Sequence, residues 1–151
     1  MKIFELSDRP DKLENSINYF WKCWGNESNF NFYSDCIKNS FNKEKTIPKF
    51  YIGIESDEMI GSYALITNDL LSRQDLMPWL ACLFVGERHR KKGYAEMLLN
   101  HGLNQAKIKG FEHLYLNTDL VNFYEKKGWA KYGKGFSFSG DELKIYKKST
   151  L

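Results

Sequence analysis

The sequence has few cysteines, no long hydrophobic run and no large excess of charge of one sign. Its cysteines, Cys23, Cys36 and Cys82, are odd in number and lack the spacing of a metal site. They therefore predict reduced thiols rather than a disulfide framework or a metal centre. The longest apolar run ends at Val85, far short of a bilayer span, and charge near the N-terminus is atypical of a signal peptide. We expect a cytoplasmic protein with no metal and no membrane partner.

The charge balance is also too even to indicate a nucleic-acid partner. The net charge is +3, from 22 Lys and Arg against 19 Asp and Glu, and a polyanion partner usually requires a stronger basic excess. The 151 residues include 42% hydrophobic and 27% charged side chains, which is typical of one globular domain with its own core. With no repeat or linker visible, we expect a single domain over residues 1–151. Homodimer formation is left open.

Hydrophobic periodicity predicts an α+β fold with a mixed, mostly antiparallel sheet. The expected strands are 1–6, 50–54, 59–66, 79–85, 113–118, 129–136 and 142–146, and the expected helices are 13–25, 30–41 and 93–110. Asp119 is expected to cap a further short helix that ends at Lys127. The strand, helix and strand between Trp79 and Thr118 form a central βαβ unit. The two strands of this unit should therefore be parallel neighbours.

The most informative segment is an apolar strand, Trp79–Val85, that leads into a basic turn and then directly into a helix. The turn ends in Arg90-Lys91-Lys92-Gly93-Tyr94-Ala95. Backbone N–H groups at such a helix start favour an anionic phosphate, and Gly93 allows close backbone approach. A basic cluster alone is more often a solvated surface, but its place between strand and helix favours a phosphate loop. Gly-x-x-x-x-Gly-Lys and complete Gly-x-Gly-x-x-Gly signatures are absent, which argues against ATP and NAD.

At these residues the chain resembles the GNAT superfamily of acetyl-CoA-dependent N-acetyltransferases. Their hallmark motif is Gln/Arg-x-x-Gly-x-Gly/Ala, matched from Arg90 to Ala95. A second signature is matched by Phe123-Tyr124-Glu125-Lys126-Lys127-Gly128-Trp129. The order and spacing of the two motifs agree, so the resemblance covers residues 50–148. It implies the GNAT (acyl-CoA N-acyltransferase) fold, with acetyl-CoA as co-substrate.

The resemblance also implies which residues bind the coenzyme. Backbone N–H groups of the turn would hold the pyrophosphate, with added charge from Lys91 and Lys92. The main chain of the preceding strand would bond to the pantetheine arm, in a slot that opens where the two strands of the βαβ unit splay apart. The implied coenzyme-binding residues are Leu83, Phe84, Val85, Arg90, Lys91, Lys92, Gly93, Tyr94 and Ala95.

Acetyl transfer to an amine needs a neutral amine, a polarised carbonyl and a proton for the departing thiolate. By resemblance Tyr124 is the general acid that supplies this proton, and the alternative is a core tyrosine. Cys82 lies mid-strand, where a small buried residue is expected, so we expect direct attack by the amine rather than a covalent acetyl-enzyme.

The general base is less evident from the sequence. Many relatives have a glutamate in the strand before the turn, but that position is Leu80 and the strand has no carboxylate. Asp75, in the polar segment before the strand, is then the candidate base, directly or through water; the alternative is a loop aspartate beside Arg73. Asp69 is a weaker candidate. His89 and Glu87, beside the turn, are expected to face solvent.

The acceptor pocket of the family is usually shaped by the N-terminal helices and the closing hairpin, which are rich in aromatic residues here. Phe20, Trp21 and Trp24 are expected in the core. Phe30, Phe32 and Tyr33 surround the break between the helices, and with them a pocket for a small-molecule amine or peptide is expected. Other functions stay open: a non-catalytic acyl-CoA-binding module, and a nucleic-acid- or ribosome-binding protein that uses the basic turn.

Overall fold

The computed structural model describes all 151 residues. The strands are β1 (Lys2–Glu5), β2 (Lys49–Glu55), β3 (Glu58–Ile66), β4 (Trp79–Val85), β5 (His113–Thr118), β6 (Ala130–Phe136) and β7 (Glu142–Ser149). The α-helices are α1 (Leu13–Trp24), α2 (Phe30–Asn39) and α3 (Tyr94–Ile108), and short 3-10 helices are η1 (Leu6–Asp8), η2 (Pro10–Lys12), η3 (Glu87–His89) and η4 (Glu125–Lys127). These bounds agree with the expected strands and long helices to within a few residues.

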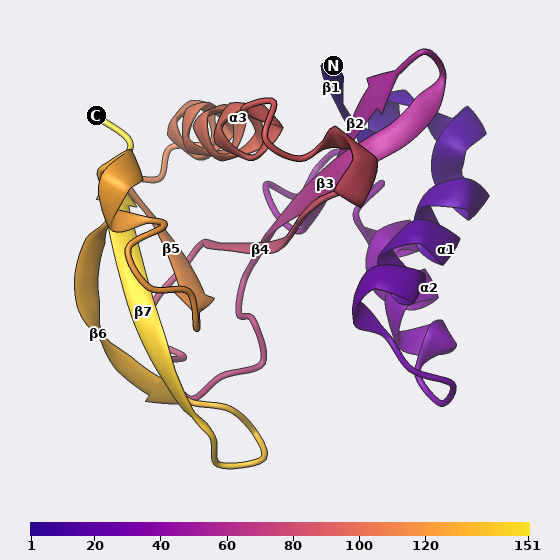
Figure 1. Ribbon diagram of the computed structural model, residues 1–151. Helices are drawn as coiled ribbons and strands as arrows, with labels where there is room; N and C mark the ends of the chain where they lie inside the picture. The colour runs from indigo at the N-terminus through magenta and orange to yellow at the C-terminus, as the bar shows by residue number, and fades with distance from the viewer.

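The strands form one seven-stranded sheet in the order β1-β2-β3-β4-β5-β7-β6. All neighbouring pairs are antiparallel except β4 and β5, which are parallel. The α+β class, the mostly antiparallel sheet and the central βαβ unit are thus confirmed. The pair β4–β5 is joined at one register position, Trp79 opposite Tyr115. Beyond this position the strands separate, and Figure 1 shows β1–β3 and β5–β7 as two halves on either side of β4.

Helix α3 covers one face of the sheet and lies across the two halves (Figure 1). Its buried residues Leu98, Leu99 and Ala106 recur at helical spacing and pack against the sheet, which is the pattern of an amphipathic helix. Gly102 lets the helix come close, because a Cβ atom there would lie 2.7 Å from Cδ1 of Leu80. The long helix of the βαβ unit is therefore held tightly over β3 and β4.

Helices α1 and α2 pack beside the β1–β3 half (Figure 1) and cover the opposite face. Ile17 and Phe20 of α1 and Ile37 of α2 are buried against Phe50 and Ile52 of β2. The rings of Phe20 and Phe50 meet edge to face with centroids 5.1 Å apart, a favoured aromatic geometry. This second core holds α1 and α2 against the β1–β3 half of the sheet.

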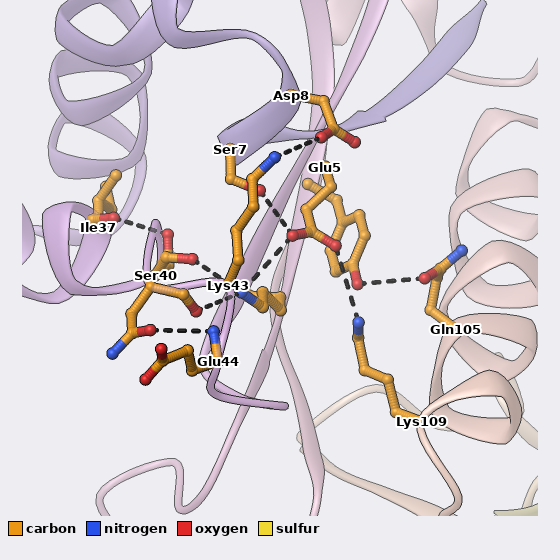
Figure 2. A network of polar contacts seen from close by, with 12 residues as sticks. Glu5, Ser7, Asp8, Ile37, Ser40, Lys43, Glu44, Gln105 and Lys109 are labelled. Carbon is orange, nitrogen blue, oxygen red and sulfur yellow. Dashed lines mark hydrogen bonds and ion pairs between the residues drawn. The ribbon is translucent and has the colours of Figure 1, made fainter.

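A buried polar network joins the loop after α2 to β1 and to the end of α3. Lys49 is 4% exposed; its Nζ donates to the carbonyls of Ser40 and Asn42 and lies 3.6 Å from Glu5. Glu5 lies 3.7 Å from Lys109, and Figure 2 shows the lysine approaching it from α3. A buried ammonium needs such partners. The network lies away from the β4–β5 opening and has a structural role.

Two local expectations are wrong. The segment after Asp119 forms only the 3-10 turn η4, with no side-chain cap, and Asn122 has a left-handed φ of 61° that interrupts any longer helix. Trp24 is 44% exposed rather than in the core, because it ends α1 beyond the edge of the packed face and meets Phe84 with ring centroids 6.4 Å apart. Among the helices, none combines the length and the apolar character that crossing a membrane would require.

Candidate active site

A cleft of about 420 Å³ opens where β4 leaves β5. Strand β4 forms one wall, the turn before α3 forms one end, and the segment after β5 forms the other wall. The lining residues are Leu83, Phe84, Val85, His89, Arg90, Lys91, Gly93, Tyr94, Ala95, Glu96, Leu120, Phe123, Tyr124 and Lys127. Both sequence motifs therefore contribute to one cavity, although they are separated by a helix and a strand.

The turn before α3 presents backbone donors to the cleft. Lys91 and Gly93 both have left-handed backbones, with φ of 61° and 80°, and a Cβ atom at Gly93 would meet nothing within 4 Å. The first helical hydrogen bond runs from the N–H of Met97 to the carbonyl of Gly93, so the N–H groups of the preceding turn have no helical acceptor. Such a turn at a helix N-terminus binds phosphate oxygens. Glycine is needed here for its backbone conformation rather than for space.

Two side chains of the turn hold it in place instead of pointing freely into the cleft. The Nε of Arg90 donates to the carbonyl of Val85 at 3.0 Å. The hydroxyl of Tyr94 donates to Glu55 at 2.6 Å, and this bond holds the pKa of the Glu55 carboxyl below its usual value. The turn is thus fastened to the end of β4 and to the end of β2.

Strand β4 carries a bulge in the wall of the cleft. Cys82 has a φ of 54°, and the β3–β4 register shifts by one residue there. The hydroxyl of Ser62 on β3 donates to the Cys82 carbonyl at 3.0 Å. Because the carbonyl and the N–H of one trans peptide point in opposite directions, the N–H of Leu83 is directed away from β3. The bulge therefore turns one backbone donor toward the β5 side, where the cleft lies.

Tyr124 is buried in the cleft wall, with an exposed fraction of 7%. Its ring packs against Trp129 and Tyr146 at centroid distances of 6.1 and 6.2 Å. Burial raises the pKa of Tyr124 to about 12, since a low dielectric disfavours the phenolate. At neutral pH the group is therefore a protonated phenol that lines the cleft.

Asp75 is exposed and already paired. Its two carboxylate oxygens accept from Nε and Nη2 of Arg73 at 2.9 and 2.7 Å. This bidentate bond holds the pKa of Asp75 below its usual value. A carboxylate that is stabilised in its charged form accepts protons poorly. The geometry thus fits the alternative of a loop aspartate beside Arg73 better than it fits a base.

Asp69 lies in the same connection between β3 and β4 but in a different setting. One carboxylate oxygen accepts from Nδ2 of Asn117 on β5 at 2.8 Å, and no ion pair includes Asp69. Burial raises the pKa of Asp69 to about 6. Burial raises the pKa values of Cys82 on β4 and Tyr33 on α2, and the charge of Asp69 adds to both shifts. The carboxylate is held to β5 by a neutral amide.

The family model of the GNAT acetyltransferases matches residues 13–129, more than three quarters of the chain. The chain belongs to the GNAT acetyltransferase family. Both sequence motifs lie within the matched region.

Individual relatives of this acetyltransferase are distant. It is 25% identical over 97 residues to N-alpha-acetyltransferase 30 of Schizosaccharomyces pombe, a match over 60% of this chain and 64%, less than two thirds, of the relative. An N-acetyltransferase structure from Staphylococcus aureus Mu50 has a TM-score of 0.70 and 14% identity, covering 99% of this chain and 98% of that one. An aminoglycoside 6'-N-acetyltransferase complexed with coenzyme A has a TM-score of 0.68 and 18% identity, covering 100% and 98%. These structures confirm the GNAT fold.

Most of the residues that line the cleft are ones the sequence predicts. Of the expected coenzyme-binding residues only Lys92 lies outside the cavity lining. The lining residues that the sequence does not predict are His89, Glu96, Leu120, Phe123 and Lys127. His89 was expected to face solvent, but it is partly buried and its Nδ1 lies 3.8 Å from Glu55. Phe123 and Lys127 stand inside the second motif, which was a usable signal, whereas the contact of Glu96 with Lys127 at 3.2 Å required the fold.

Proposed function

We propose that the protein transfers an acetyl group from acetyl-CoA to the primary amine of a small molecule or peptide, by direct attack of the amine. The observation that carries this proposal is that one cleft contains the donor-rich turn, the β4 bulge and the buried phenol of Tyr124. A non-catalytic acyl-CoA-binding module would need only the turn and the cleft walls. A protonated phenol in the wall of the cleft supports a reaction.

The donor half of the cleft suits a coenzyme A thioester. N–H groups before α3 would bind the pyrophosphate, and Lys91 would add positive charge. The edge of β4 that faces β5 is unpaired beyond Trp79, so the pantetheine arm can bond to the strand as an added partner would. Apolar side chains of Leu83, Leu120 and Phe123 line the same path. The thioester would then reach the bulge, where the Leu83 N–H can polarise its carbonyl.

Tyr124 is proposed as the acid that protonates the departing thiolate. A phenol with a pKa of about 12 is a weak acid for an exposed thiolate, whose thiol has a pKa of about 8.5. Burial acts on thiols as well, since it raises the pKa of the Cys82 thiol beside the cleft above its usual range. A coenzyme sulfur buried in the cleft would have a raised thiol pKa in the same way, and the pKa difference between the phenol and the thiol would become smaller. A proton donor placed in this way accelerates transfer by about 100-fold or more.

The acceptor class is drawn from the relatives and is part of the proposal. One structural relative acts on aminoglycosides, and the sequence relative is an N-alpha-acetyltransferase. The aromatic residues near the helix break here are partly exposed, as Phe32 at 47% and Phe30 at 37% show. They suit the apolar body of a small amine. Two other acceptor classes should be compared with a small amine: a short peptide with a free N-terminus and a polycationic aminoglycoside.

Titration calorimetry with acetyl-CoA tests the donor first. We expect binding in the micromolar range, and absence of binding at millimolar acetyl-CoA would overturn the proposal. Thiol release is then measured with 2-phenylethylamine, kanamycin and an unblocked peptide as acceptors. Acceptor-dependent release of free coenzyme A supports the enzyme. Binding without release for any amine in a wider panel would favour the acyl-CoA-binding module, and tight binding of RNA in place of acetyl-CoA would favour a nucleic-acid role.

A further inference from the structure

Asp69 lies beside β5, outside the residues that line the cleft, and on the face of the sheet opposite Tyr124. It bonds to Asn117, which alternates along β5 with Leu114 and Leu116, two residues buried in the core under α3. Because successive side chains of a strand point to opposite faces, Asn117 points to the face that α1 and α2 cover. Tyr124 packs in the core on the α3 side. A thioester between β4 and β5 would therefore lie between the phenol and the carboxylate.

The loop that carries Asp69 is held firmly. Asn68 accepts from the N–H of Leu71 at 2.9 Å and donates to the carbonyl of Arg73 at 3.2 Å. Ser72 exchanges bonds with Phe136 of β6: its N–H donates at 2.8 Å and its hydroxyl accepts at 2.9 Å. The carboxylate thus has a fixed position relative to β5 and β6, as a reacting group requires.

The groups around Asp69 on the neighbouring elements are uncharged at neutral pH, so none of them holds the carboxylate in its charged form as an ion-pair partner would. Asn117 of β5 is neutral and occupies one carboxylate oxygen. Tyr33 of α2 and Cys82 of β4 are the titratable groups that feel its charge, and burial raises the pKa of both, Tyr33 to about 12. Neither is charged at neutral pH. No lysine or arginine neutralises the carboxylate, in contrast to the Arg73 partner of Asp75.

We propose that Asp69 is the general base of this acetyltransferase and that Asn117 is the residue that positions it. The proposal rests on the proposed function and extends it to the acceptor side. Because Asp69 is a single carboxylate, it favours acceptors that carry one ammonium group. The raised pKa of Asp69, about 6, keeps the group ionised at neutral pH and still basic enough to take a proton.

The carboxylate of Asp69 takes one proton from the substrate ammonium and passes it to solvent. The free amine then attacks the thioester carbon, forming the C–N bond, and the C–S bond breaks with its electron pair on sulfur. Sulfur takes the phenol proton of Tyr124. The second proton lost by nitrogen returns to the tyrosinate through solvent, so each turnover releases one proton.

The position of Asp69 can be tested without turnover. The side-chain carboxyl signal of Asp69 in protein labelled with ¹³C-aspartate is assigned by its loss in Asp69→Asn and followed against pH. We expect a midpoint near 6 that rises when acetyl-CoA binds, because the thioester displaces water from the carboxylate. An unchanged midpoint in the presence of saturating acetyl-CoA would place Asp69 outside the reacting centre and overturn the proposal.

Kinetics with 2-phenylethylamine tests the role. Asp69→Asn should lower kcat by about 100-fold or more, the usual contribution of a general base, whereas Asp69→Glu should recover part of this loss. Asn117→Leu should move the acid limb of the kcat profile to higher pH, because the amide bond favours the charged carboxylate. Asp75→Asn is the matched change in the same loop, and it should retain the limb.

The outcomes separate the two proposals. An active Asp69→Asn enzyme with an unaltered acid limb, or loss of that limb in Asp75→Asn, would overturn the role of Asp69 and leave acetyl transfer intact. A wild-type protein that binds acetyl-CoA yet acetylates no amine would instead defeat the proposed function. Circular dichroism of each variant at the assay temperature shows that a loss of activity is not a loss of fold.

Discussion

The donor side and the acceptor side of the cleft are built in different ways. The proposed donor side consists mainly of one continuous stretch, from Leu83 to Glu96, whose backbone conformation creates the N–H donors. The proposed acceptor side depends on side chains of separate segments, with Asp69 and Asn117 brought together by the sheet. A binding surface made of backbone has a motif in the sequence, whereas one made of distant side chains has none.

Within the acceptor side, two aspartates six positions apart show what environment does to one chemical group. Asp75 is exposed and held by Arg73, and its pKa is lowered. Asp69 is partly buried and held by a neutral amide, and its pKa is raised to about 6. Proximity to β4 in sequence favours Asp75, but the partner of each carboxylate decides which can accept a proton.

The largest expected effect is on the donor side. Tyr124→Phe should lower kcat by about 100-fold or more while the affinity for acetyl-CoA stays nearly unchanged, because only the leaving thiolate loses its proton donor. Steady-state kinetics and calorimetry give the two quantities. Tyr132→Phe, at a tyrosine outside the cleft lining, is the control and should retain activity. A Tyr124→Phe enzyme with wild-type kcat would refute the general-acid role.

The two aspartates should have opposite effects on the pH dependence of stability. The pKa of Asp69 rises from 3.8 to about 6 on folding, so its carboxyl stabilises the fold below pH 4 and loses that contribution as pH rises through 6. From pH 4 to pH 7, Asp69→Asn should therefore gain about 2 kcal/mol in unfolding free energy relative to wild type.

Asp75 should affect the pH dependence of stability in the opposite direction, because its pKa is lowered on folding. Its charged form stabilises the fold above the unfolded pKa, and this contribution is lost as pH falls. Asp75→Asn should therefore be less stable than wild type at pH 7 and approach wild type at low pH. Urea unfolding at several pH values measures both variants. If the unfolding free energies of the two variants changed with pH in the same way, the two aspartates would not differ in their electrostatic environment.

A smaller effect is expected at the phosphate turn. Gly93→Ala forces a side chain onto a left-handed backbone, a strain of about 1–2 kcal/mol, and should weaken acetyl-CoA binding by about tenfold as the turn relaxes. Gly110→Ala carries the same strain at the other end of α3, with φ of 86° and open space. It should lower stability and leave the dissociation constant unchanged. Equal affinities for the two variants would show that the turn conformation does not matter for binding.

The smallest expected effect separates two neighbouring lysines. Lys91 lines the cleft and Lys92 does not. Lys91→Ala should weaken acetyl-CoA binding by about two- to fivefold at low salt, with a smaller effect at high salt because exposed charges are screened. Lys92→Ala should change binding less. Calorimetry at two salt concentrations measures both, and a stronger effect at Lys92 would contradict the arrangement of the turn.

The sequence predicts the strand, turn and helix that line the cleft because the information for them is local. Gly93 and Tyr124 each stand in a motif with fixed spacing, and the strand, turn and helix around Gly93 follow from periodicity. The acceptor side depends on contacts between positions far apart, such as Asp69 with Asn117, which is 48 residues away. Nothing near Asp69 in the sequence shows that it will be buried. In the same way Trp24 continues the apolar helical pattern of α1, but the helix extends past the part of the sheet that could bury this side chain.

A crystal structure of the protein with acetyl-CoA bound would show whether donor and acceptor meet at the β4 bulge. We predict a pantetheine arm along β4, a thioester carbonyl on the Leu83 N–H, and sulfur within hydrogen-bond reach of the Tyr124 hydroxyl. Asp69 should face the carbonyl carbon from the opposite side of the sheet. An acetyl group bound away from the β4 bulge, or one separated from Asp69 by ordered protein, would overturn the proposed roles of the Leu83 N–H and Asp69.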